Sequence, residues 1–166
     1  MTWKNPPANE NASPYAAKGF LLSHAELRFF RSLQQAVERD TLIAVKVRLA
    51  DLVGCIEKTP DKATLGRITQ KHVDFVLFDH CHTRILAAIE LDDSSHERET
   101  TIRRDAFVNE LLNSVGIPLL RVQAAGGYNP MVIRQQIYLT LGRGRPRQAS
   151  LRRPRRTTHA ARRYRR

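Results

Sequence analysis

Three acidic residues in the middle of the sequence, Asp74, Glu90 and Asp92, have the types and spacing of a metal site. Successive side chains of a strand point to opposite faces, so Glu90 and Asp92 share one face of an extended segment. Pairing of the predicted strands 72–78 and 85–91 as a hairpin brings Asp74 beside Glu90 and gathers three carboxylates. Like charges this close are relieved by protonation or by a divalent cation, and oxygen ligands favour Mg²⁺ over zinc. The sequence therefore predicts a site for Mg²⁺ (or Mn²⁺).

The elements that must position these acids follow from the periodicity of the apolar residues. A capping box, Ser-His-Ala-Glu from Ser23, opens a helix whose apolar residues recur every three or four positions. Alternation indicates the strands that carry the acids, and Gly116 with Pro118 ends the helix that follows them. Asn129 before Pro130 starts the last helix. The predicted order is αβββαβα, with helices at 23–39, 97–115 and 130–141 and strands at 41–47, 72–78, 85–91 and 119–122.

Two parts of this assignment rest on weaker patterns. The connector 51–69 contains Gly54, Pro60 and Gly66 and shows no periodicity that assigns an element. For the helix 97–115, the sequence predicts a buried stripe of Ile102, Ala106, Phe107, Leu111, Leu112 and Val115.

The net charge of +12 is concentrated at the C-terminus. Of the 28 Lys and Arg, eleven Arg lie in 142–166, which contains no acid. Residues 1–141 therefore contain the other 17 basic residues and all 16 Asp and Glu, a net charge of +1. Such a segment cannot bury enough apolar surface to offset its ordering entropy, and we expect it to be disordered when unbound. It is suited to binding the nucleic-acid backbone without sequence readout; a nuclear-import signal or an acidic protein partner is the alternative. The arginines are Arg143, Arg145, Arg147, Arg152, Arg153, Arg155, Arg156, Arg162, Arg163, Arg165 and Arg166.

Composition narrows the class of protein further. With 42% apolar residues, the chain can bury a core of ordinary size. It has no apolar run long enough for a membrane span and no signal-peptide pattern, so we expect a cytoplasmic protein with no membrane partner. Two cysteines, Cys55 and Cys81, make no disulfide framework by themselves and are predicted to be free thiols. The oligomeric state is left open.

The order and spacing of the motifs resemble a known group of enzymes. Asp74, followed sixteen positions later by Glu90-Leu91-Asp92 within an αβββαβ order, resembles the PD-(D/E)XK nuclease superfamily. His-Val-Asp-Phe, Ile-Glu-Leu-Asp-Asp-Ser-Ser-His, Arg104-Asp105 and Gly-Ile-Pro-Leu-Leu-Arg-Val resemble a bacterial domain-of-unknown-function family related to very-short-patch repair endonucleases. This resemblance covers 20–122.

The resemblance implies a fold and a division of the chain. It implies a single α/β, restriction-endonuclease-like domain over 20–141, with a mixed central sheet flanked by helices. Residues 1–19 are expected to form an irregular arm, because three prolines lie among Asn, Ala and Ser there. The basic segment 142–166 follows the domain as a tail.

The resemblance also implies an activity, the Mg²⁺-dependent hydrolysis of DNA phosphodiester bonds, with RNA as a further candidate partner. Asp74 and Glu90 would hold the metal, and Glu26 on the first helix would contribute through water. Asp92 stands where the superfamily has a lysine and cannot supply positive charge. His96 is then the candidate general acid or base. The alternative is a nuclease-fold module that binds nucleic acid and cuts nothing.

Each assigned residue has a structural alternative. Acids within apolar strands are costly to bury unpaired, and Arg121 or Lys46 is a candidate partner for Asp74 and Glu90. Asp92 begins a stretch that is also typical of a strand-to-helix turn. Glu26 occupies the acidic position of the capping box, and His96 near a helix start is equally suited to solvent.

Overall fold

The computed structural model describes residues 15–56, 61–92 and 99–142, without the side chains of 99–105. Four strands form one sheet in the order β1-β2-β3-β4, in which β1, β2 and β3 are antiparallel and β4 runs parallel to β3. The predicted mixed sheet with flanking helices is therefore confirmed. The elements are α1 His24–Ala36, β1 Thr41–Arg48, α2 Leu49–Leu52, α3 Lys62–Thr69, β2 His72–Asp79, β3 Ile85–Asp92, α4 Glu99–Ser114, β4 Leu119–Gln123 and α5 Pro130–Thr140.

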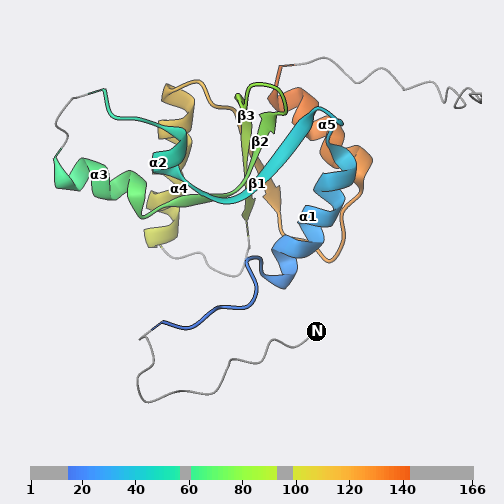
Figure 1. Cartoon of the computed structure of the whole chain (residues 1–166), viewed down its shortest axis with the longest axis horizontal. Coiled ribbons are helices and arrows are strands. Elements are labelled where there is room, and N and C mark those ends of the chain that lie inside the picture. Colours follow the sequence, from blue (N-terminus) through green and yellow to red (C-terminus); the bar gives the residue numbers. More distant parts are fainter. Residues whose placement is uncertain (1–14, 57–60, 93–98, 143–166) are drawn as a thin grey trace, which may run out of the picture.

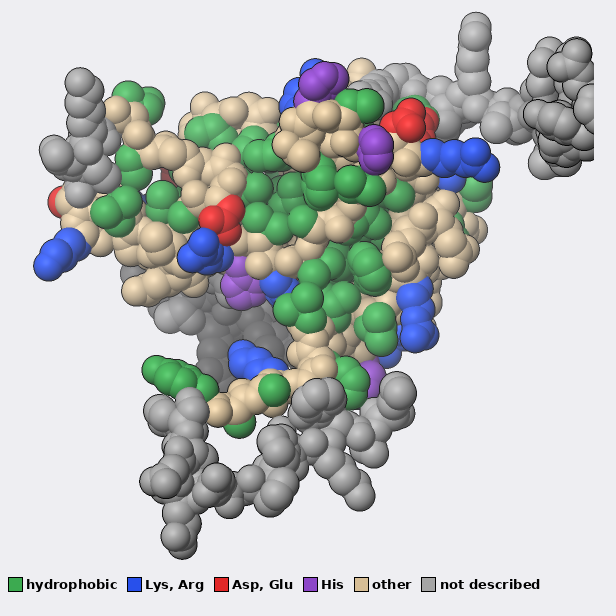
Figure 2. All heavy atoms as spheres, in the orientation of Figure 1, with side chains coloured by type: hydrophobic (Ala, Val, Ile, Leu, Met, Phe, Trp, Pro, Cys, Tyr) green, Lys and Arg blue, Asp and Glu red, His purple; other side chains and the backbone are tan. Residues whose placement is uncertain are grey.

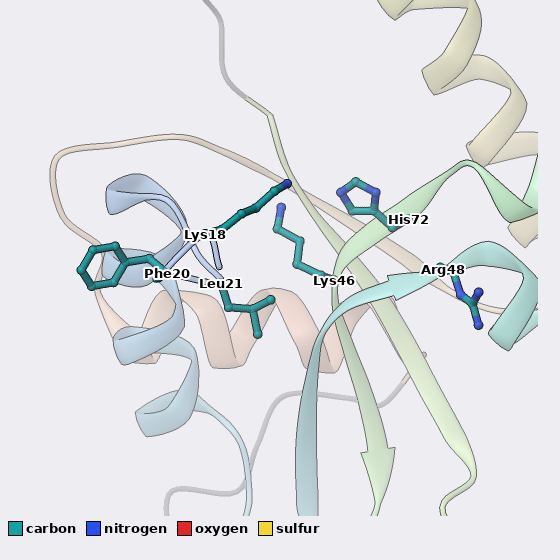
Figure 3. Close-up of a pocket in the computed structure, with 7 residues that line it drawn as sticks. Lys18, Phe20, Leu21, Lys46, Arg48 and His72 are labelled. Carbon is teal, nitrogen blue, oxygen red and sulfur yellow. The ribbon is translucent and has the colours of Figure 1, made fainter. Parts of the chain in front are cut away.

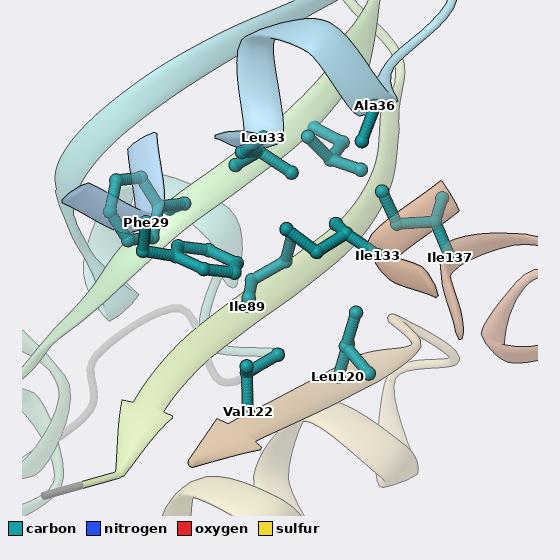
Figure 4. Packing of buried hydrophobic residues seen from close by; sticks show 10 residues of the cluster. Phe29, Leu33, Ala36, Ile89, Leu120, Val122, Ile133 and Ile137 are labelled. Carbon is teal, nitrogen blue, oxygen red and sulfur yellow. The ribbon is translucent and has the colours of Figure 1, made fainter. Parts of the chain in front are cut away.

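Helices cover both faces of this sheet. Helices α1 and α5 lie side by side on one face, and α4 and α2 lie on the other, with α3 farther from the sheet (Figure 1). Each face has its own apolar core. The core under α1 and α5 is drawn in Figure 4 and contains Phe29, Leu33, Ala36, Phe75, Leu77, Ile89, Leu120, Val122, Ile133 and Ile137. The core under α4 contains Leu49, Val53, Ile68, Val73, Val76, Ala88, Val108 and Leu112.

Helix α1 begins where the capping box predicts. The Ser23 hydroxyl accepts the Glu26 N–H at 3.3 Å, and the Glu26 carboxylate accepts the Ser23 N–H at 2.8 Å. These two bonds satisfy backbone donors that the first turn leaves without a helical partner. The helix ends at Ala36, three residues before the predicted end. Its orientation on the sheet is set by Phe29, whose ring contacts Phe75 on β2 at a centroid distance of 5.3 Å.

The connector 51–69 contains helical structure that the sequence pattern did not assign. Helix α2 overlaps its start, and α3 begins after Asp61, whose side chain accepts the Thr64 N–H at 2.6 Å. Both helices are short, and within α3 only Ile68 is buried. A single buried residue gives no periodicity to detect.

The buried face of α4 differs from the predicted stripe. Val108 and Leu112 are buried, Phe107 and Leu111 are half-buried, and Ala106 and Val115 are exposed. Ile102 lies outside the described side chains. Val108 and Leu112 are four positions apart and share a helix face, from which Ala106 is turned well away. The prediction was wrong for Ala106, which lies on another face, and for Val115, which follows the last residue of α4, whereas Phe107, Leu111 and Leu112 pack in the α4 core as predicted.

Other predictions concern the ends of the chain, the cysteines and the membrane. Of the arm expected at 1–19, only 15–19 is described, and it forms no helix or strand. The tail lies outside the described residues except for Gly142. Cys55 and Cys81 are free, as predicted. Within 15–56, 61–92 and 99–142, no helix is both long and apolar enough to cross a membrane.

The core under α1 gives a stability prediction that compares two leucines. Leu33 is fully buried, whereas Leu139 on α5 is 63% exposed. We expect Leu33→Ala to lower the free energy of unfolding by about 2–5 kcal/mol, because it removes buried methyl groups and leaves a cavity. Leu139→Ala should change it by less than about 0.5 kcal/mol. Urea unfolding followed by circular dichroism measures both, and equal losses would contradict this packing.

Candidate functional site

The alternation of side chains breaks at one point on each of two paired strands. On β1, Val45 packs in the α1 core and Val47 in the α4 core, although residues two apart normally share a face. Their partners on β2 also lie in different cores, Phe75 in the α1 core and Val73 in the α4 core. Lys46 lies at the break with a left-handed backbone, φ 54°, which costs a non-glycine residue about 1–2 kcal/mol.

This break lets Lys46 reach the first turn of α1. The Lys46 ammonium lies 2.5 Å from Glu26 Oε1 and 2.8 Å from Asp74 Oδ1, so one cation joins two carboxylates from different elements. The side chains of Lys46, Glu26 and Asp74 are 24%, 16% and 12% exposed. We call this group the Lys46 bridge. It combines charge pairing with partial exclusion of water, which strengthens electrostatic attraction.

The second oxygen of Asp74 fixes the carboxylate against the next strand. Asp74 Oδ2 accepts the backbone N–H of Leu91 at 3.0 Å. The register between β2 and β3 ends with the pair Phe75 and Ile89, and Asp74 and Glu90 are the next residues of the two strands. The bridge therefore ties together α1, β1, β2 and β3.

The titration of Lys46 reflects these contacts. Burial lowers the pKa of the Lys46 ammonium, but its hydrogen bonds to Asp74 and Glu26, together with the attraction of both charges, raise it by more. The net pKa of Lys46 lies above its ordinary value of 10.5. Lys46 is therefore fully charged at neutral pH.

Asp92 belongs to a different ion pair. Ile89 and Leu91 contact the α1 core, so alternation places Glu90 and Asp92 on the opposite face of β3. There the Arg121 guanidinium lies 2.6 Å from Asp92 Oδ1 and also donates to Asn109 of α4. Arg121 thus neutralises the charge of Asp92.

The predicted cluster of Asp74, Glu90 and Asp92 is not observed as a group of three carboxylates among the described residues. Among the described residues, no three or more His, Cys, Asp and Glu side chains are arranged to hold a metal ion. Lys46 pairs with Asp74, which was one alternative for that residue, and the Lys46 bridge brings Glu26 to the same place. The role of Glu90 stays a prediction. His96 lies outside the described residues, so its role is untested.

A hollow opens beside the Lys46 bridge, between the segment that precedes α1 and the ends of β1 and β2. Its volume is about 600 Å³, and it is lined by Lys18, Gly19, Phe20, Leu21, Lys46, Arg48 and His72. In Figure 3 the side chains of Lys18 and His72 lie on either side of the Lys46 ammonium. Figure 2 shows the hollow from outside, with Lys or Arg and His side chains facing each other across it.

The sequence predicted the two acids of this site, Glu26 and Asp74, but not most of the basic residues around them. Lys46 entered only as a pairing alternative, and Lys18 and Arg48 were not considered. For Lys46 the signal is one lysine inside an otherwise apolar strand. Lys18 lies in a segment without regular structure, and nothing in its sequence indicates that it faces β1 and β2.

The family of the chain follows from comparison with known proteins. Residues 18–141 match the family described as "Protein of unknown function (DUF2726)", and this match spans more than half of the 166 residues. The chain belongs to the DUF2726 family. The DUF2726 match includes the Lys46 bridge and every residue that lines the hollow. No curated protein and no solved structure matches the chain. The nuclease resemblance of this DUF2726 member therefore stays a prediction.

The raised pKa of Lys46 predicts a specific dependence of stability on pH. A group whose pKa is raised by folding stabilises the fold fully below its unfolded pKa and loses that contribution as pH rises through its folded pKa. The unfolding free energy of the wild type, minus that of Lys46→Met, should be constant up to about pH 10 and fall above it.

Urea unfolding between about pH 8 and 11.5 measures this difference. Lys62→Met is the matched control, because Lys62 is exposed on α3. The unfolding free energy of the wild type, minus that of Lys62→Met, should show no comparable fall above about pH 10. A Lys46→Met difference that stays constant across the whole range would contradict the bridge.

Proposed function

We propose that this chain is a metal-dependent nuclease that hydrolyses DNA phosphodiester bonds. The observation that carries the proposal is the Lys46 bridge, two carboxylates held around one cation beside a hollow lined by Lys18, Arg48 and His72. Such a hollow attracts a phosphate, and the carboxylates beside it suit a hard metal. The resemblance of the motifs around Asp74 and Glu90 to PD-(D/E)XK nucleases supports the same chemistry.

The donor set fits Mg²⁺. Glu26 and Asp74 offer carboxylate oxygens, and Mg²⁺ is commonly held by one or two carboxylates, with water and substrate phosphate completing its shell. A cation, the Lys46 ammonium, already lies within hydrogen-bond distance of both groups. Glu90, a predicted ligand, precedes Leu91, whose N–H binds Asp74. When bound, Mg²⁺ supplies polarisation of the phosphate and activation of water.

The residues of the chain then have separate tasks. Asp74 is oriented by the Leu91 N–H, and Glu26 by the Ser23 N–H of the helix cap, so neither carboxylate depends on solvent for its position. Lys46 supplies the positive charge that Asp92 cannot, from β1 instead of β3. It is directed at the charge that develops on the phosphate oxygens. Arg121 cancels the charge of Asp92, which would otherwise repel the substrate.

A second candidate function is a module that binds nucleic acid without cutting it. Its supporting observation is the position of Asp92, which replaces the superfamily lysine and is held in an ion pair with Arg121. In that case the Lys46 bridge is a structural link between α1 and the sheet. The two functions differ in one expectation: a nuclease cleaves DNA and loses this cleavage when Glu26 or Asp74 is replaced, whereas a binding module cleaves no DNA at all.

Cleavage of DNA tests the proposal. The purified chain with Mg²⁺ or Mn²⁺ should nick supercoiled plasmid, and Asp74→Asn and Glu26→Gln should each lower the rate by at least about 100-fold. Both variants keep a group that accepts the N–H bonded by the native side chain, so the fold is retained. Glu110→Gln, on the exposed face of α4, is the matched control and should cleave as the wild type does.

Two outcomes contradict the nuclease. Equal cleavage by the wild type and both site variants would assign the activity to a contaminant. Absence of cleavage with either metal on duplex, mismatched, branched and single-stranded DNA would favour the binding module.

A further inference from the structure

The hollow beside the Lys46 bridge has an unusual balance of charge. Four of its seven lining residues are Lys, Arg or His, and none is an acid. Three acids pair with these basic residues, Glu26 and Asp74 with Lys46 and Asp51 with Arg48, but none of the three lines the hollow. The lining itself therefore presents basic and uncharged side chains to a ligand.

The basic residues of the hollow come from three separate parts of the chain. Lys18 belongs to the segment before α1, Arg48 ends β1 and His72 begins β2. In Figure 3 the Lys18 chain extends from its segment toward Lys46, across the opening of the hollow. The folded domain therefore assembles a cationic surface that no single run of the sequence contains.

The partner of Arg48 does not block this surface. The Arg48 guanidinium donates to both Asp51 oxygens, at 2.9 and 3.0 Å, but both side chains are about half exposed or more. Exposed ion pairs of this kind contribute little to stability. Arg48 is therefore able to exchange Asp51 for a phosphate, which takes the same bidentate contact.

We infer that this hollow binds the sugar–phosphate backbone of a nucleic-acid strand through Lys18 and Arg48, next to the Lys46 bridge. The inference rests on the proposed function, since it places the backbone of the substrate beside the reacting site. The volume of about 600 Å³ lies within the range of ligand sites and takes a short length of one strand. Phe20 points away from the cations in Figure 3, so the contact reads phosphate and not a base.

The salt dependence of binding isolates this contact from the arginine tail, which every variant keeps. Each neutralised duplex phosphate adds about 0.9 to the slope of log K against log salt concentration. The full-length double variant Lys18→Ala with Arg48→Ala should therefore lower the slope by about 1.8, and Lys18→Ala alone by about 0.9. Anisotropy of a fluorescent DNA duplex, measured in EDTA at several salt concentrations, gives the slopes without cleavage.

The matched control is the double variant Arg31→Ala with Lys62→Ala, which removes the same charge from exposed positions that do not line the hollow. It should keep the wild-type slope. The inference is overturned if the hollow variants keep the wild-type slope, if the control loses as much as they do, or if the full chain binds no DNA.

The binding result and the cleavage result are independent. A chain that cleaves DNA while its hollow variants keep the wild-type slope is a nuclease without this backbone site. A chain whose slope falls as expected, but which cleaves nothing, has the backbone site without the nuclease function.

Discussion

The pairing of the Lys46 ammonium with Glu26 and Asp74 is the constraint around which the site is arranged. Carboxylates that are 16% and 12% exposed lose much of their hydration, and a charge left alone in such surroundings is costly. The left-handed backbone of Lys46, with φ 54°, breaks the alternation of β1 and brings the ammonium to α1. The strain of this backbone is offset by the pairing of the two carboxylates, which would otherwise stay partly buried without a cation. Removing Lys46 would leave two carboxylates facing each other without a cation, so the position of both acids depends on this ammonium.

The parts of the fold that the sequence predicts are those with a strong local signal. Alternation around Val73, Phe75 and Leu77 identified β2, and the box from Ser23 to Glu26 identified the start of α1. The Lys46 bridge could not be predicted in the same way. A lysine in a strand is expected to turn to solvent, and only the break at Val45 and Val47 reverses this. In helix α4, Phe107, Leu111 and Leu112 pack in the core as predicted, but Val108, which is buried between them, was not among the predicted residues.

The distribution of charge connects the site with the rest of the chain. In the proposed function, the eleven arginines of 142–166 would attract nucleic acid over about a Debye length. The basic residues of the hollow would then orient a phosphate relative to Glu26 and Asp74. Lys46 and Arg121 pair with the acids Glu26, Asp74 and Asp92, whose charges would otherwise repel such a substrate.

We propose that Glu26 and Asp74 form a cation site in which the Lys46 ammonium competes with a divalent metal. Titration of Mn²⁺ into the protein without DNA, followed by electron paramagnetic resonance of free Mn²⁺, measures this competition directly. We expect Lys46→Met to bind Mn²⁺ at least about tenfold more tightly than the wild type, a gain of about 1.4 kcal/mol, because the competing charge is gone. Lys62→Met should bind as the wild type does. Equal or weaker binding by Lys46→Met would contradict the competition.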